Sequence, residues 1–210
     1  MLEWIETSFK SHYHVVRNTT WPEKILVAGR NAVRDDKACH ECTLQSMNVC
    51  KAPEGLIIMS HRDICQVDIE TFVSQMHGLK AAEGHCCDFL FADEDVKVVL
   101  CDLTCSQKKY VQPFTNSSGY HEGKRATAYR QIESTIDKLM DVPEIRHHFA
   151  SMSSRVGLFA ERNKDTVFRD VAIQNMQLMM PDYVQGSNLN TDMGHGFEFV
   201  TVLYPQTYQW

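Results

Sequence analysis

The sequence predicts a mixed α/β (α+β) protein whose sheet is not built from regular strand–helix alternation. Several short apolar runs bounded by turn residues have the length and composition of β-strands. Residues 124–140 carry apolar side chains at helical spacing, with charged side chains between them. These strands and helices follow one another irregularly, which is typical of a mixed sheet rather than a purely parallel one.

The N-terminal part of the chain contains elements of both kinds. Residues 35–50 carry three cysteines and a histidine without a clean period, so we expect a loop or a short helix there. The remaining elements expected in this part are a helix over 2–9, strands over 13–16, 24–27 and 55–60, and a helix over 67–76.

The second part of the chain begins with two apolar runs, 87–91 and 96–104, joined by an acidic turn. A polar segment over 112–123 is expected to be a loop. The helix over 124–140 should end at Asp141-Val142-Pro143, because proline interrupts helices. We expect a strand over 155–160, a helix over 165–180 and a strand over 196–204.

Length, charge and cysteine content limit the class of protein. The 210 residues fit one domain, and no low-complexity linker divides them. The net charge of −6 argues against broad, nonspecific binding of nucleic acid. No secretory signal or membrane-spanning apolar run is visible, which predicts a cytoplasmic location. In that compartment, the eight cysteines are expected to be free thiols or metal ligands. Local basic candidates are Lys108, Lys109, Lys124, Arg125 and Arg130.

Two carboxylates frame the hairpin expected over residues 87–104. Asp88 opens its first strand, and Asp102 lies near the end of its second strand. An antiparallel hairpin can bring these two side chains to one end of the sheet, where paired carboxylates can hold Mg²⁺ or Mn²⁺. The alternative is that Asp88 caps a turn and Asp102 is an ordinary polar residue at a strand end.

The order strand, strand, long amphipathic helix, strand, with these two acids, resembles the restriction-endonuclease-like (PD-(D/E)XK) superfamily. The resemblance covers about residues 65–160 and implies a nuclease-like core there, with residues 1–64 and 161–210 as elaborations of the same single domain. It implies a mixed central sheet flanked by helices. It also implies that Asp88 and Asp102 are the catalytic, metal-binding acids, and that Gln131 with Tyr129 occupies the helical position that contributes a glutamine or tyrosine.

Thr104 departs from this pattern, because the superfamily has a lysine two positions after the second acid. Threonine lacks the positive charge that helps to orient a water and to stabilise the charge developing on phosphorus. Lys124 at the start of the helix is the best replacement, and Lys108 or Lys109 is the next. The substitution predicts a site that cuts poorly or not at all.

Cysteines and histidines suggest two further sites. Cys39 and Cys42 form a CxxC pair that could hold zinc, although structural zinc sites usually combine two such pairs. The alternative is that the cysteines are buried thiols that pack as small apolar groups. His77 and His85 precede Asp88 and could approach a metal there. No local signature of a cysteine nucleophile is present.

Two segments are candidates for protein contacts. The methionine-rich helix over 173–180 could pack in the core or form an interface with a protein partner or a second copy of the chain, because methionine adapts to varied surfaces. The aromatic residues over 204–210 would also suit docking if they are exposed.

Three functions follow from these observations. The preferred one is a nuclease-like protein with a degenerate site, acting as a subunit or accessory module of a prokaryotic nucleic-acid-processing or defence assembly. The first alternative is an active Mg²⁺- or Mn²⁺-dependent nuclease of DNA or RNA, in which Lys124 replaces the lysine and Gln131 positions substrate or water. The second alternative is a zinc-binding interaction protein.

Overall fold

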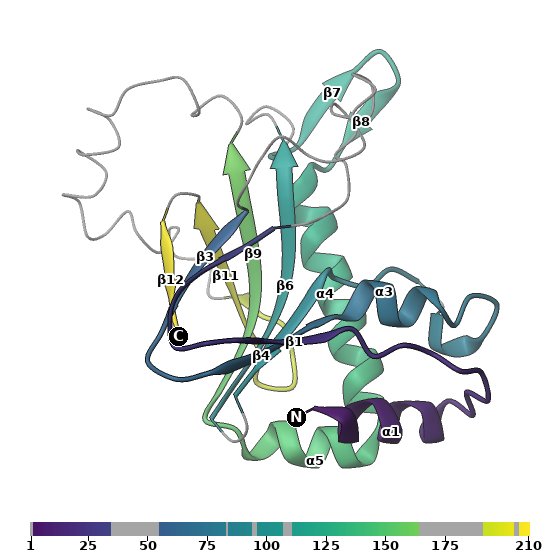
Figure 1. Ribbon diagram of the computed structural model, residues 1–210. Helices are drawn as coiled ribbons and strands as arrows, with labels where there is room; N and C mark the ends of the chain where they lie inside the picture. The colour runs from purple at the N-terminus through teal and green to yellow at the C-terminus, as the bar shows by residue number, and fades with distance from the viewer. Residues whose placement is uncertain are drawn as a thin grey trace.

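The computed structural model describes residues 2–34, 55–82, 84–93, 96–106, 111–163, 191–203 and 206–210. It confirms a mixed α+β protein. Within these residues, a seven-stranded sheet and a three-stranded sheet pack together, four α-helices accompany them, and a separate two-stranded hairpin projects from the body (Figure 1). No helix in the described ranges is long and apolar enough to cross a membrane.

The large sheet combines antiparallel and parallel strands in the order β1-β4-β5-β6-β9-β11-β10. Strands β1, β4, β5 and β6 pair antiparallel, whereas β9 pairs parallel to β6 and β11 parallel to β9. A parallel pair needs a crossover, and the chain between β6 and β9 supplies it. The strands are β1 (Glu23–Leu26), β4 (Ile64–Asp68), β5 (Phe89–Ala92), β6 (Lys97–Ser106), β9 (Ser154–Asn163), β10 (Thr191–Asp192) and β11 (Glu198–Leu203).

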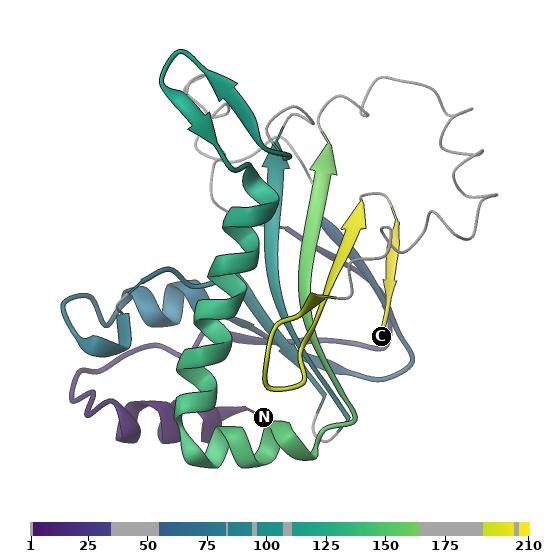
Figure 2. The ribbon, with the colours of Figure 1, turned by 180° about the vertical axis from the view of Figure 1, so that it is seen from behind.

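Helices lie on one face of this sheet, as Figure 2 shows for the crossover helix α4. The helix predicted over 124–140 is α4 (Lys124–Asp141), and its predicted apolar stripe, including Ile132 and Ile136, is buried. Val142 and Pro143 end it and begin the next helix, with proline in the first turn. The other helices are α1 (Glu3–His12), α3 (Ile69–Ser74), the short 3₁₀ helix η1 (Lys80–Ala82) and α5 (Pro143–Ser151).

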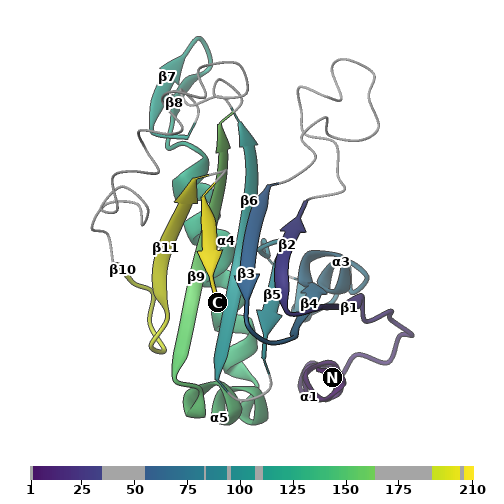
Figure 3. The same cartoon turned by 60° about the vertical axis from the view of Figure 1, so that its left-hand side comes forward.

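The opposite face is covered by strands instead of helices. Figure 3 shows β2 (Gly29–Val33), β3 (Leu56–Ser60) and β12 (Thr207–Gln209) in front of β6 and β9. A second core fills the space between the two sheets, with Ile58, Phe91 and Tyr208 among its members. Among the described residues, the helices that flank the central sheet therefore lie on one face only.

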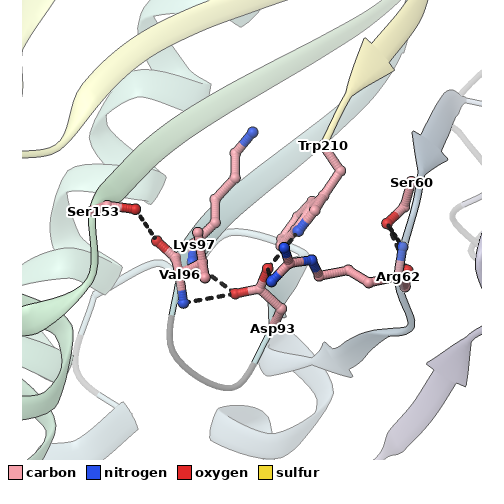
Figure 4. A network of polar contacts seen from close by, with 7 residues as sticks. All are labelled: Ser60, Arg62, Asp93, Val96, Lys97, Ser153 and Trp210. Carbon is pink, nitrogen blue, oxygen red and sulfur yellow. Dashed lines mark hydrogen bonds and ion pairs between the residues drawn. The ribbon is translucent and has the colours of Figure 1, made fainter.

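The turn between β5 and β6 is fastened to the C-terminal strand. One carboxylate oxygen of Asp93 accepts hydrogen bonds from the backbone N–H groups of Val96 and Lys97, and the other accepts one from the indole N–H of Trp210 at 3.0 Å (Figure 4). The ammonium of Lys97 lies over the rings of Tyr208 and Trp210. Tyr208 is buried, so these aromatic side chains pack against the protein itself.

Three local predictions differ from the structure. Residues 13–16 are not a strand, because His14 adopts a left-handed backbone conformation and the N–H of Val15 bonds back to Lys10. The helix predicted over 67–76 begins only at Ile69, since Asp68 ends β4 and caps α3 through the N–H of Thr71. The loop predicted over 112–123 contains a hairpin, β7 (Phe114–Asn116) and β8 (Gly119–His121).

Candidate functional site

The β5–β6 pairing places Asp88 and Asp102 opposite each other. Phe89 pairs with Cys101, so the next position outward joins the two aspartates. Leu90 and Leu100, two residues away on these strands, belong to the core beneath the helices. Because side chains alternate along a strand, Asp102 lies on the face that α4 covers. Asp88 directly precedes β5.

A backbone bond holds one carboxylate beside the other. Asp88 Oδ2 accepts a hydrogen bond from the N–H of Leu103 at 2.7 Å, and Leu103 directly follows Asp102. The side chain of Asp102 is buried, with 7 % of its surface exposed. Asp102 makes a further interaction within the protein, so the pair is a candidate site because two acids lie close together at one end of the sheet.

Helix α4 anchors the segment that leads into Asp88. The amide of Gln131 donates to the carbonyl oxygen of Cys86 at 3.2 Å, and the hydroxyl of Thr135 accepts from the N–H of Cys87 at 2.9 Å. The same hydroxyl donates to the carbonyl of Gln131. The amide of Gln131 therefore holds the backbone two residues before Asp88.

The charges of the two aspartates affect the pKa values of two buried thiols. Burial raises the pKa of Cys87 and of Cys101 well above the ordinary 9.0, and the nearby charges of Asp88 and Asp102 raise both further. A thiol in such surroundings stays protonated, and only the thiolate is a good nucleophile or metal ligand. These two cysteines therefore belong to the packing around the site.

The parallel pairing of β6 and β9 brings a third acid near the aspartates, which the sequence did not reveal. Thr104, which stands where the resemblance leads one to expect a lysine, pairs with Glu161. Phe159 belongs to the core beneath the helices, so alternation places Glu161 on the same face two residues further along. The sequence does place Glu161 directly after the strand predicted over 155–160, and this acid could have indicated a third carboxylate at the end of the sheet.

Lys124 lies at the same level as this end of the sheet. Ile132 of α4 contacts β9 at Gly157, since a Cβ added there would meet its Cγ2 at 3.0 Å. From that contact, Glu161 lies about 13 Å along the strand and Lys124 about 12 Å back along the helix. The side chain of Lys124 is exposed, and its ammonium makes no hydrogen bond or ion pair with the described residues.

Other residues predicted at the site lie elsewhere or cannot be placed. Tyr129 packs edge-on against Phe199, with ring centroids 5.2 Å apart, so its ring packs against the hydrophobic core. His77 and His85 are exposed. Lys108, Lys109, Cys39, Cys42 and the methionine-rich helix over 173–180 lie outside the described residues.

Comparison of the chain with protein-family models, with curated proteins and with solved structures finds no match in any of the three. The functional assignment therefore depends on the residues and their geometry.

The geometry of the described residues limits how a metal ion could be bound. In the part of the chain that the structure describes, no three or more His, Cys, Asp or Glu side chains converge closely enough to hold a metal together. A cation at Asp88 and Asp102 would thus rely on two carboxylates and on water or substrate oxygens. This arrangement suits Mg²⁺, which usually keeps several waters and takes one or two carboxylates.

A surface pocket of about 360 Å³ lies at the other end of α4, between Asp137, Arg146 and Tyr13 of neighbouring helices and turns. Burial and the charge of Asp141 raise the pKa of Tyr13 to about 12, so its hydroxyl stays neutral and donates to the carbonyl of Lys138. These groups hold α1 against α4, at the opposite end of α4 from Lys124.

Proposed function

We propose that this chain is a nuclease-like protein with a degenerate site, similar to the restriction-endonuclease-like superfamily, in which Asp88 and Asp102 hold Mg²⁺ or Mn²⁺ next to a nucleic-acid strand. In this proposal it acts as a subunit or accessory module of a prokaryotic nucleic-acid-processing or defence assembly. The observation that carries the proposal is that Asp88, one position beyond the Phe89–Cys101 pair, accepts a hydrogen bond from the N–H of Leu103, which directly follows Asp102.

The donor set fits the proposed cation. Carboxylate oxygens are the ligands that Mg²⁺ and Mn²⁺ prefer, and two of them leave coordination positions for phosphate oxygens and water. When bound, such a cation neutralises phosphate charge and makes a water molecule more acidic. The order β5, β6, α4, β9, with Asp88 before β5 and Asp102 on β6, agrees with the pattern on which the resemblance rests.

Thr104 is the reason for proposing a degenerate site. Hydrolysis of a phosphodiester forms a bond from a water oxygen to phosphorus and breaks the bond to the leaving ester oxygen. The attacking water gives up a proton to the surrounding solvent, and the leaving oxygen takes up a proton from it. A lysine ammonium would stabilise the negative charge that develops in this step. The neutral hydroxyl of Thr104 cannot do so, and Glu161 opposite it adds a carboxylate at the same place.

Restoring the lysine tests this proposal. With Mn²⁺ and labelled single-stranded or duplex substrates, we expect Thr104→Lys to cleave at least tenfold faster than the wild type. Adding Asp102→Asn to Thr104→Lys should abolish that gain. Thr7→Lys on the exposed part of α1 adds the same charge far from the aspartates and serves as the matched control. A folded Thr104→Lys protein without any gain contradicts the proposal.

The position of Lys124 favours one alternative, an active nuclease in which its ammonium replaces the missing one. In that case the wild type cleaves, and Lys124→Ala lowers the rate at least tenfold whereas Lys124→Arg retains part of it. Lys80→Ala removes an exposed lysine from η1 and is the control. Equal rates for Lys124→Ala and Lys80→Ala rule out this role for Lys124.

Assembly into a larger complex is tested separately. Protein tagged at its natural level in its own cells can be purified gently and measured by native mass spectrometry. A discrete complex heavier than one chain supports the subunit role. A strictly monomeric protein without a partner contradicts it.

A further inference from the structure

The β7–β8 hairpin presents an aromatic ring to solvent. All three views show the hairpin projecting beyond the end of β6, beside the start of α4 (Figures 1, 2 and 3). Tyr120 on β8 is 71 % exposed. Among the described residues, the other exposed large apolar side chains are aliphatic, namely Val16, Ile25, Val27 and Val96. An ordered hairpin with an uncovered ring at this position needs an explanation.

The tip of the hairpin is well ordered without using Tyr120. On the strands, Phe114 and His121 stack with ring centroids 4.7 Å apart. In the turn, Asn116 Oδ1 accepts from the backbone N–H and the hydroxyl of Ser118, and it lies 3.0 Å from His121 Nε2. The ring of Tyr120 therefore takes no part in the contacts that close the hairpin.

The base of the hairpin is hydrogen-bonded to the start of α4 and carries basic side chains. Arg125 N–H donates to the carbonyl of Val111 at 3.1 Å, which ties the start of the helix to the chain entering the hairpin. Lys124 is exposed, while Arg130 forms an ion pair with Glu122. The Arg125 guanidinium lies 5.8 Å from the ring centre of Phe199.

We propose that Tyr120 stacks on an unpaired base of a nucleic-acid strand whose phosphates contact Lys124 and continue toward Asp88 and Asp102. Aromatic rings next to basic side chains are a common way to bind single strands, since every base offers a π-face. The chemistry is shared by DNA and RNA. This inference rests on the proposed function, because the aspartates define where the strand leads.

Binding of labelled oligonucleotides tests the inference. Fluorescence anisotropy with a single-stranded DNA, an RNA of the same sequence and the corresponding duplex is measured in metal-free buffer, so that the aspartates need no cation. Loss of one stacked base predicts that Tyr120→Ala weakens single-strand binding by about fivefold to a hundredfold. Tyr120→Phe should bind like the wild type, because it keeps the ring. Val16→Ala removes an exposed apolar side chain elsewhere and should have no effect.

A cross-linking measurement locates the contact independently of the variants. An oligonucleotide that carries a photoactivatable base should cross-link to Tyr120, and mass spectrometry identifies the modified peptide. Cross-links elsewhere only, equal binding by Tyr120→Ala and the wild type, or preference for the duplex would each overturn the inference. Failure of all three oligonucleotides to bind would overturn it as well, and a protein partner would then be the occupant to seek.

The outcome is distinguishable from failure of the proposed function. If Thr104→Lys gains cleavage while Tyr120→Ala binds normally, the proposed function stands and the inference about Tyr120 falls. If Tyr120→Ala loses binding but the aspartates bind no metal, the inference about Tyr120 stands and the proposed function falls.

Discussion

The carboxylate of Asp88 accepts a hydrogen bond from the backbone N–H of Leu103 at 2.7 Å. Leu103 lies between Asp102, the second acid of the proposed site, and Thr104, where the proposed resemblance would require a lysine. The bond therefore fixes Asp88 relative to the very part of β6 that the proposed site uses. Asp88 thus has two roles in this account: it accepts a structural hydrogen bond, and it is proposed to bind a metal ion. Different replacements of Asp88 should therefore affect stability and metal binding differently.

Replacement of Asp88 separates these two roles. Asp88→Ala leaves the N–H of Leu103 without its acceptor, so we expect the free energy of unfolding to fall by about 1–3 kcal/mol. Asp88→Asn keeps an oxygen that can accept the bond and should retain most of the stability, yet it removes the charge that a cation needs. Urea unfolding measures both variants, and equal stability of Asp88→Ala and Asp88→Asn would show that the bond contributes nothing.

Two glycines provide a matched pair at the hairpin. Gly119 and Gly123 both have positive φ, at 115° and 86°. A Cβ at Gly119 would meet nothing within 4 Å, whereas one at Gly123 would approach the carbonyl group of Gln112 at 2.5 Å. We expect Gly119→Ala to cost about 1–2 kcal/mol from backbone strain alone and Gly123→Ala to cost more. Thermal unfolding compares them, and a smaller loss for Gly123→Ala would contradict the close packing at the start of α4.

Replacing Asp93 and replacing its partner Arg62 should have very different effects on the free energy of unfolding. Asp93 is buried and accepts three hydrogen bonds, so Asp93→Ala should lose about 2–4 kcal/mol of stability. Arg62 contacts the same carboxylate at 3.5 Å, but its side chain is 58 % exposed, so Arg62→Ala should lose at most about 1 kcal/mol. Denaturant titration distinguishes the two, and similar losses would show that the exposed ion pair dominates.

Stability should fall at alkaline pH because of the buried thiols. Burial raises the pKa of Cys65 to about 12 and the pKa values of Cys87 and Cys101 well above the ordinary 9.0. Above pH 9 the thiols ionise in the unfolded chain but stay protonated in the folded protein. The stability present below pH 9 is therefore lost progressively as the pH rises toward the folded-state values.

Cys101→Ala tests the source of this loss. Urea unfolding under reducing conditions between pH 8 and 10.5 should give a shallower decline for this variant, by up to about 1.4 kcal/mol per pH unit for one thiol. An unchanged slope would mean that Cys101 ionises equally easily in both states.

Local patterns predicted the elements that present the site. Helix α4 was predictable because its apolar side chains recur at helical spacing and all face one core. The β5–β6 hairpin was predictable because two apolar runs flank a short acidic turn. The opposition of Asp88 and Asp102 follows directly from that hairpin once its register is known.

Long-range pairing and backbone conformation could not be predicted from local patterns. The position of Glu161 opposite Thr104 depends on the parallel register of β6 and β9, which are separated by the whole of α4. The strand predicted over 13–16 has suitable residues, but the backbone hydrogen bonds that close the end of α1 and the left-handed conformation of His14 override this preference. The hairpin β7–β8 is built from polar residues that resemble a loop, and its turn bonds only become visible in the structure.

Binding of Mn²⁺ to the aspartate pair is the measurement that tests the central claim most directly. Isothermal titration calorimetry of the wild type should give one Mn²⁺ per chain, with affinity reduced at least tenfold in both Asp88→Asn and Asp102→Asn. Glu144→Gln removes an exposed carboxylate from α5 and should bind like the wild type. Unchanged affinity in both aspartate variants, or no binding by the folded wild type, would contradict the claim that these two residues form a metal site.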